Sequence, residues 1–147
     1  MTERSKIESR NERREVLVED IMSRNVVTVP YSSTIGEAAR VMKKNGIGCV
    51  VVKKDSELLG IVTERDIVRI LAEGRPEAST VIDILSKPPI TIGPKDPVSG
   101  AARILSQKGI RRLPVVEGQS LIGILTSTDV VNFYAKISKQ MMKNVGP

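Results

Sequence analysis

Gly60-Ile61-Val62-Thr63-Glu64-Arg65-Asp66 decides the fold, because its pattern returns 63 residues later as Gly123-Ile124-Leu125-Thr126-Ser127-Thr128-Asp129. Each copy predicts a short apolar strand that ends in Thr-x-x-Asp and continues directly into an amphipathic helix. A hydroxyl and a carboxylate at the start of a helix can hold a small polar ligand. The sequence therefore predicts two such junctions, at matching positions, in one molecule.

The repeat extends well beyond this stretch. Residues 18–72 align without a gap on residues 81–135, and 18 of the 55 aligned pairs are identical. Many other pairs exchange one apolar residue for another, as Val27 and Ile90 do. Chance does not keep such a register over so long a span, so the chain contains an internal duplication.

Each copy predicts the element order β-α-β-β-α. The first strand covers residues 26–29 in one copy and 90–92 in the other, and it stops at a proline or a glycine-proline pair. The next helix starts at a capping residue and ends at a glycine in the left-handed conformation. The predicted helix ends are Thr34 (in a capping box with Glu37) and Gly46, and then Asp96 (followed by Pro97 as the first helical residue) and Gly109.

Two further strands and a helix complete each copy. Short polar turns join the strands and require antiparallel hairpins, whereas the helix between the first two strands predicts a parallel, right-handed crossover. The predicted strands are 49–52 and 58–62, then 113–116 and 121–125, and the last helices run from Thr63 to about Glu73 and from Thr126 to near Met142.

We therefore expect an α/β (α+β) fold in which two β-α-β-β-α repeats, related by a pseudo-twofold axis, pack sheet to sheet around a shared interior. The expected organisation is an N-terminal segment at 1–15, a first repeat at 16–76 and a second repeat at 77–147. The two repeats together form one module.

The composition limits the class of protein. Hydrophobic residues make up 40% and charged residues 27% of the chain, as in soluble globular proteins. The single cysteine, Cys49, excludes an internal disulfide and indicates a reducing compartment. Because no apolar run approaches the length of a membrane span and the N-terminus is charged, we expect no membrane association and a cytoplasmic location.

Two other functions compete with ligand binding. An enzyme is disfavoured because the chain has no histidine and none of the common phosphate-loop or nucleophile motifs, so we expect no catalytic residues and no metal site. The alternative is a basic protein of net charge +6 that binds nucleic acid, or a protein-interaction scaffold without a nucleotide ligand. One Phe and two Tyr leave no aromatic platform on which bases could stack.

The duplicated element order, the Leu-Pro-Val-Val strand at 113–116 and the paired Gly-h-h-Thr-x-x-Asp junctions (h, hydrophobic) resemble a tandem pair of cystathionine-β-synthase (CBS) domains, a Bateman module. One departure is Val51, which stands where the second repeat has Pro114. The resemblance covers roughly residues 16–140. It implies a regulatory module that binds AMP, ADP, ATP or S-adenosylmethionine in clefts between the repeats and signals to a separate effector protein.

The resemblance also implies two sites, each built from both repeats. One site would consist of Ser23, Val27, Ile47, Gly48, Thr126, Thr128 and Asp129. Its twin would consist of Ser86, Ile90, Ile110, Arg111, Thr63, Arg65 and Asp66. Homodimers are implied as well, packed through the helices that follow the junctions, for which we expect five exposed apolar residues: Ile67, Ile70, Leu71, Val130 and Phe133.

The chemistry of the residues agrees with these sites. A carboxylate can accept hydrogen bonds from both ribose hydroxyls, and the free N–H groups of a helix start suit a phosphate. Arg65 and Arg111 would both serve the second site, whereas Gly48 replaces Arg111 in the first, so we expect unequal sites with the Asp66 site as the better phosphate binder. The alternatives without a ligand are that each Thr-x-x-Asp is an ordinary helix cap, that Arg111 is a solvated surface residue and that Ser23 and Ser86 are turn residues.

Overall fold

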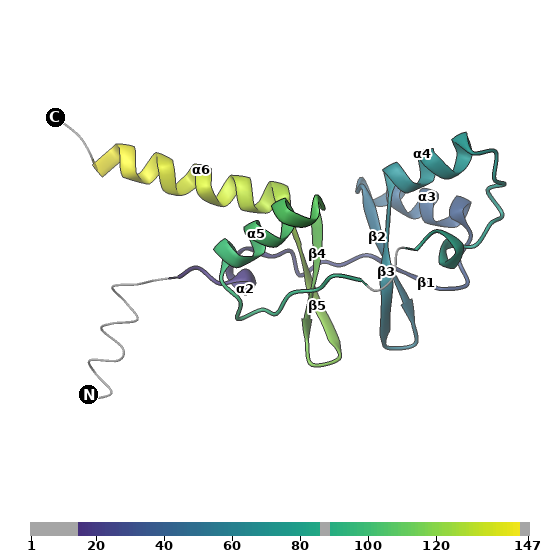
Figure 1. Ribbon diagram of the computed structural model, residues 1–147, viewed down its shortest axis with the longest axis horizontal. Coiled ribbons are helices and arrows are strands. Elements are labelled where there is room, and N and C mark those ends of the chain that lie inside the picture. Colours follow the sequence, from purple (N-terminus) through teal and green to yellow (C-terminus); the bar gives the residue numbers. More distant parts are fainter. Residues whose placement is uncertain (1–14, 86–88, 145–147) are drawn as a thin grey trace.

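The computed structural model describes residues 15–85 and 89–144, and the predicted N-terminal tail lies outside this part (Figure 1). The first half of the chain forms α2 (Val18–Ile21), β1 (Thr28–Pro30), α3 (Ile35–Asn45), β2 (Cys49–Lys54), β3 (Glu57–Thr63) and α4 (Glu64–Ala72). The second half forms η1 (Val81–Ile84), α5 (Val98–Lys108), β4 (Arg112–Glu117), β5 (Ser120–Thr126) and α6 (Ser127–Asn144). This is the predicted mixed fold of two repeats.

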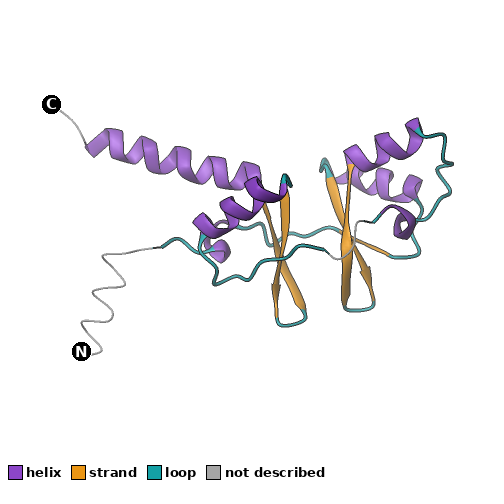
Figure 2. Ribbon diagram, in the orientation of Figure 1, coloured by secondary structure: helices purple, strands orange, loops and turns teal. Residues whose placement is uncertain are grey.

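Each half is built around a β-hairpin, and the two hairpins face each other (Figure 2). Strands β2 and β3 pair antiparallel, as do β4 and β5, and β1 lies parallel to β2. Both hairpins shift register at equivalent positions, between Val52 and Lys53 and between Val115 and Val116. The predicted hairpins and the parallel crossover in the first repeat are thus confirmed.

The predicted strand at 90–92 is wrong, because only Ile92 pairs, in an isolated parallel bridge with Val115. In the first repeat, the Val51 N–H donates to Val27 and the Tyr31 N–H donates to Lys53, which extends the pairing on both sides. The residues equivalent to these two donors are Pro114 and Pro94, and neither has an N–H to give. The duplicated sequence therefore forms a strand in one half and a bridge in the other.

The helix ends follow the predictions with two exceptions: Asp96 does not cap its helix, and the predicted capping box of Thr34 and Glu37 has only the bond to the Thr34 hydroxyl among the described residues. The Glu37 N–H donates to the Thr34 hydroxyl at 3.1 Å, and Gly46 and Gly109 end α3 and α5 at φ values of 63° and 62°. Asp96 does not cap α5, which starts after Pro97 without a side-chain cap. The Asp96 carboxylate instead accepts the N–H of Gly93 at 2.8 Å, so it closes the preceding turn.

The two halves exchange their leading segments. Val18 and Met22 of the α2 segment (residues 16–23) are buried in the core of the second half, whereas Val81 and Ile84 of η1 are buried in the core of the first. Most buried apolar residues form two separate clusters, and Val51 and Ile124 belong to neither, so the single shared interior predicted from the sequence is wrong. Each core is completed by a segment from the other repeat.

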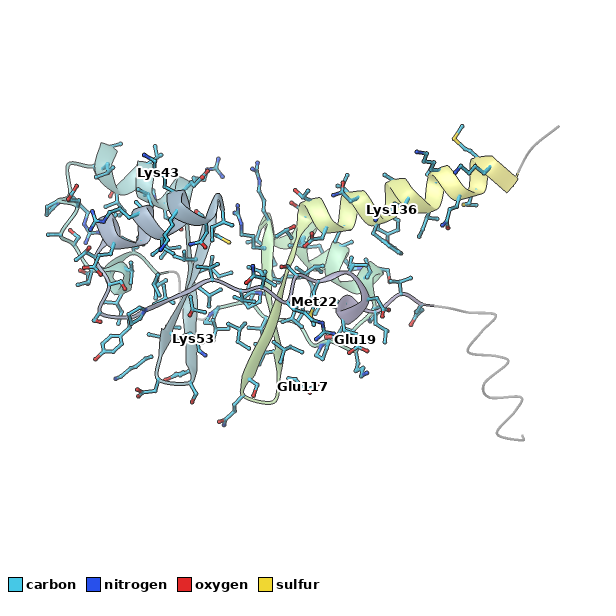
Figure 3. The ribbon with its side chains drawn as sticks, turned by 180° about the vertical axis from the view of Figure 1, so that it is seen from behind. Glu19, Met22, Lys43, Lys53, Glu117 and Lys136 are labelled. Carbon is cyan, nitrogen blue, oxygen red and sulfur yellow. The ribbon has the colours of Figure 1, made fainter. Side chains whose placement is uncertain are left out.

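The exchange is reciprocal down to single hydrogen bonds. The Val18 N–H donates to the Asp96 carbonyl, and at the equivalent place the Val81 N–H donates to the Ser33 carbonyl, both at 2.9 Å. The α2 segment also forms an ion pair with the second half, in which Nζ of Lys95 lies 2.7 Å from the Glu19 carboxylate. Glu19 and Met22 lie together on the second half in the view from behind (Figure 3). The pseudo-twofold relation therefore includes the crossing segments.

The surfaces of α4 and α6 correct one expectation. Ile67, Ile70 and Val130 belong to the cores, because the helices that follow the junctions turn these residues inward. Phe133 is partly buried, and Leu71 alone of the five is exposed, at 52%. The other exposed large apolar residues of the two helices are Val68, Val131, Tyr134, Met141 and Met142. Among the described residues, no helix combines the length and apolar character required to span a bilayer.

Candidate functional site

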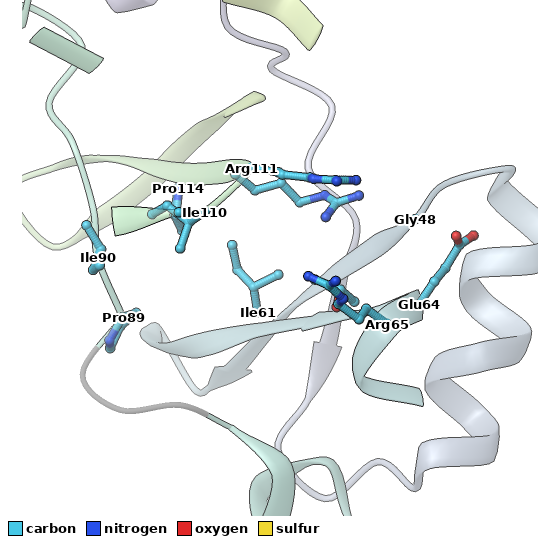
Figure 4. A pocket seen from close by; sticks show the side chains of 12 residues that line it. Gly48, Ile61, Glu64, Arg65, Pro89, Ile90, Ile110, Arg111 and Pro114 are labelled. Carbon is cyan, nitrogen blue, oxygen red and sulfur yellow. The ribbon is translucent and has the colours of Figure 1, made fainter. Parts of the chain in front are cut away.

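Two pockets combine residues of both halves at the junctions where β3 meets α4 and β5 meets α6. Pocket 1 has a volume of about 370 Å³ and brings Thr63 and Arg65 of the first junction together with Ile90, Ile110 and Arg111 (Figure 4). These are five of the seven residues predicted for this site. Asp66 does not line pocket 1, and Ser86 lies outside the described residues.

Pocket 2 has a volume of about 290 Å³ and lies at the second junction. Six of the seven residues predicted for this site line it: Ser23, Val27, Ile47, Gly48, Thr126 and Asp129. Thr128 does not. Ser23 reaches pocket 2 because the α2 segment crosses onto the second hairpin. There, Ser23 and Ile124 exchange two backbone hydrogen bonds of 2.9 Å.

Both junctions are reciprocal helix caps. The Thr63 N–H donates to Oδ2 of Asp66 at 2.9 Å, and the Asp66 N–H donates back to the Thr63 hydroxyl at 3.2 Å. Thr126 and Asp129 repeat the arrangement at 2.9 Å and 3.1 Å. The cap fixes each helix start, and the threonine of each pair lines a pocket.

The carboxylates differ in what else they contact. The Thr63 hydroxyl lies 3.0 Å from Oδ2 of Asp66, and Arg69 lies 3.7 Å from Oδ1. No equivalent ion pair is found for Asp129 among the described residues, because residue 132, the counterpart of Arg69, is Asn. Asp129 lines pocket 2, and its helix cap uses Oδ2.

The charges around the pockets are unequal. Pocket 1 is lined by Arg65, Arg111 and Arg112, with Glu64 as the acidic member (Figure 4). Among the described residues, pocket 2 has Arg112 as its basic side chain and Asp129 as its acidic one. Pocket 1 therefore presents the stronger positive field to an anion.

Cys49 lines pocket 2 beside Arg112. Burial raises the pKa of the Cys49 thiol above the ordinary 9.0, while the charge of Arg112 and a hydrogen bond with it pull the pKa the other way. The protonated thiol is thus the stable form near neutral pH. At this position the chain holds a neutral group against the guanidinium.

The family model for the CBS domain matches the chain twice, at residues 18–73 and 81–136. The chain belongs to the CBS domain family. The expected tandem CBS pair is therefore confirmed.

Several curated relatives are similar over most of this chain. The uncharacterized protein MK0525 of Methanopyrus kandleri is 38% identical in an alignment 138 residues long, which covers 88% of this chain and 70% of that protein. The CBS domain-containing protein YhcV of Bacillus subtilis is 35% identical, over 77% of this chain and 81% of its own length. The match to uncharacterized protein MJ1225 of Methanocaldococcus jannaschii, 35% identical over 78% of this chain, spans only 41% of that protein.

Two solved CBS structures carry bound adenosine compounds. The CBS domain pair of protein MJ0100, in complex with 5′-methylthioadenosine and S-adenosyl-L-methionine, is 30% identical with a TM-score of 0.77, and the match covers 82% of this chain and 97% of that one. A CBS domain protein of Pyrobaculum aerophilum, complexed with AMP, is 27% identical with a TM-score of 0.74, over 82% and 99% of the two chains.

Sequence reasoning missed Arg112 and Glu64 as residues that line the pockets of this CBS pair. Arg112 aligns with Cys49 in the duplication, and Glu64 aligns with Ser127, so neither has a counterpart of its own kind. Neither residue belongs to the motifs on which the two predicted sites were based. Their positions, next to Arg111 and next to Thr63, were the signal available in the sequence.

Proposed function

We propose that the chain is a cytoplasmic regulatory module that binds adenosine-containing ligands (AMP, ADP, ATP or S-adenosylmethionine) in pockets 1 and 2. It acts on a separate effector protein and catalyses no reaction itself. The observation that carries the proposal is that each pocket combines apolar residues of one half with the threonine of the Thr-x-x-Asp junction of the other. CBS pairs of the same fold bound to AMP and to S-adenosyl-L-methionine support it.

Each part of the ligand has a partner in the proposal. Ile90 and Ile110 in pocket 1, and Val27 and Ile47 in pocket 2, offer apolar surface to the purine. Oδ1 of Asp129, the oxygen that the helix cap does not use, accepts hydrogen bonds from the ribose hydroxyls in pocket 2.

In pocket 1 the same role falls to Asp66. Because Asp66 does not line that pocket, contact with the ribose requires its Oδ1 to turn from Arg69 toward Thr63 and Arg65. Arg69 is half-exposed, so solvent can take over its charge at little cost. Ser86 and Thr128 complete the two proposed sites.

Unequal charge makes pocket 1 the better phosphate site in this proposal. Arg65 and Arg111 line pocket 1, and their counterparts are Thr128 and Gly48. A guanidinium can hold a phosphate with two parallel hydrogen bonds, and removal of one such charge-assisted interaction weakens binding by about tenfold.

The proposal is tested first by thermal unfolding with AMP, ADP, ATP and S-adenosylmethionine. A ligand that binds only the folded state adds about 2.7 kcal/mol at a hundred times its Kd and raises the melting temperature. Calorimetry with Arg65→Ala and Arg111→Ala then compares AMP with adenosine. We expect a loss of affinity for AMP alone. If no adenosine compound binds, the proposed function is wrong, and equal losses for AMP and adenosine would contradict the phosphate roles.

We also propose that two copies pair through the outer faces of α4 and α6. Val68 and Leu71 on α4 are exposed, and their equivalents on α6 are Val131 and Tyr134, so one apolar pattern occurs on both helices. A self-complementary surface of this kind suits a twofold contact between identical chains. Light scattering should give a dimer mass that Val131→Glu lowers to a monomer and that Lys136→Glu, an exposed control on α6, leaves unchanged.

A further inference from the structure

Arg112 lies where the two pockets meet. Among the described residues, only Gly48 and Arg112 line both pockets. The two are close neighbours, because a Cβ atom on Gly48 would stand 2.9 Å from Nη2 of Arg112. The guanidinium therefore fills the space that a side chain at residue 48 would occupy.

The position depends on a difference between the repeats. The counterpart of Gly48 is Arg111, whose side chain lines pocket 1 alone, and the counterpart of Arg112 is Cys49, which lines pocket 2 alone. Because residue 48 has no side chain, the guanidinium of Arg112 takes that space, and Arg112 lines pocket 2 as well as pocket 1. One guanidinium thus faces both pockets.

A guanidinium in this position can serve two anions. Arginine stays protonated at all relevant pH values and has five N–H donors in a planar fork. A hydrogen bond with Cys49 takes part of this capacity, since one thiol cannot engage five donors. In pocket 2, Arg112 is also the only basic side chain among the described lining residues, so an anion there depends on it.

We propose that Arg112 is a phosphate-binding residue common to both sites and that it couples them. An anion in one pocket takes donors and neutralises charge that the other pocket would use, so the second anionic ligand binds more weakly than the first. Adenosine has no phosphate, so it uses neither the donors nor the charge of Arg112 and binds to the two sites independently. The inference rests on the proposed function and adds to it a shared residue and a rule of occupancy.

The duplication supplies one matched reporter for each site. Ile61 lines pocket 1 and Ile124 lines pocket 2, and the two residues occupy equivalent positions in the repeats. Isoleucine methyl NMR signals from these side chains therefore follow the two sites separately in one sample. AMP and adenosine are titrated into the unaltered chain, Arg112→Ala and Arg111→Ala.

Arg112→Ala should weaken AMP binding by about tenfold at both reporters, because a charge-assisted hydrogen bond disappears from each site. Arg111→Ala, the adjacent control, should weaken AMP at Ile61 alone. Adenosine affinities should change less than about twofold in either variant. In the unaltered chain, the AMP curves at the two methyls should require a weaker second binding step, whereas the adenosine curves fit independent sites.

A second variant keeps the charge and moves it. In Gly48→Ala the new methyl group displaces the guanidinium, and AMP should weaken at both sites although Arg112 is present. If Arg112→Ala or Gly48→Ala weakens AMP at one reporter only, or at neither, the sharing of Arg112 is wrong. If adenosine shifts neither methyl in the unaltered chain, the proposed function itself fails, which separates the two results.

Discussion

Cys49 is the only thiol of the chain and lines pocket 2, so its reactivity reports on that pocket. Its raised pKa leaves less thiolate at pH 8 than an ordinary cysteine has, and the thiolate is the reactive form. We expect alkylation at pH 8 to be slower in the folded chain than in guanidinium chloride, and to keep accelerating as the pH rises past 9.0. Saturating AMP should slow it further by covering the thiol.

The rate is followed by the mass increase of the intact chain. In guanidinium chloride AMP should have no effect, which controls for any direct action on the reagent. Equal rates with and without AMP in the folded chain would show that no ligand covers Cys49, and would count against pocket 2 as a binding site.

At the scale of single elements, α5 contains a matched pair of glycines. Gly109 ends the helix at φ 62°, and no atom lies within 4 Å of the place that a methyl group would take, so alanine there meets only backbone strain. Gly100 lies in the first turn, where a methyl group would touch Pro97 at an ordinary 3.5 Å. Urea unfolding should show Gly109→Ala less stable by about 1 kcal/mol and Gly100→Ala more stable by roughly 0.5 kcal/mol. The same sign for both would contradict the assigned cap.

The elements also show what the sequence could predict. Hairpins, helix ends and the Thr-x-x-Asp caps depend on residues close together in the chain, and the structure has them where the pattern indicated. The strand at 90–92 fails because of two missing donors, Pro94 and Pro114, whose partners lie on other segments. A prediction from apolar residues alone ignores which residues have a backbone N–H. If the two prolines had been considered, this strand would not have been predicted.

At the scale of the whole molecule, the segments that cross between the halves pack against two equivalent glycines, Gly60 and Gly123. A methyl group on Gly123 would stand 2.5 Å from Sδ of Met22 and 2.9 Å from the carbonyl oxygen of Ser23, whereas one on Gly60 would meet only the side chain of Leu85, at 3.0 Å. A side chain can turn aside, but the backbone of Ser23 is fixed by its pairing with Ile124.

Gly123→Ala should therefore lower the free energy of unfolding by about 2–3 kcal/mol, and Gly60→Ala by less than about 1.5 kcal/mol. Because Ser23 lines pocket 2, the Ile124 methyl should also report weaker adenosine binding in Gly123→Ala than in Gly60→Ala. A larger loss of stability in Gly60→Ala would mean that the crossing segment on the first half is the more tightly held one.

The exchange of segments changes which fragment can fold. Residues 26–85 contain the whole first core, including Val81 and Ile84, whereas the sequence repeat 16–76 lacks both residues. Each buried aliphatic side chain contributes about 1.5–3 kcal/mol, a large share of the stability of a small domain. We expect the 26–85 fragment to unfold cooperatively in urea and the 16–76 fragment to show no transition. The reverse result would place the folding unit at the sequence repeat.

The crossing of α2 could not be predicted from the sequence, because a duplication looks the same whether a segment packs on its own repeat or on the other. Val18 and Met22 have the same apolar pattern in either arrangement. The two pockets could be predicted in outline, since eleven of the fourteen expected residues line them. The position of Arg112 between the pockets could not be predicted, because it depends on the absence of a side chain at Gly48 on the other repeat.

The reciprocal exchange also sets an order of events during synthesis. Ser23 leaves the ribosome early, but Ile124, its partner in the hairpin, is translated about a hundred residues later. Contacts between residues so distant in the chain form late and slowly. The unit from β1 to η1 can close while translation continues, and the segment around Ser23 docks only afterwards. Pocket 2, which needs Ser23, is thus completed only once β5 has emerged.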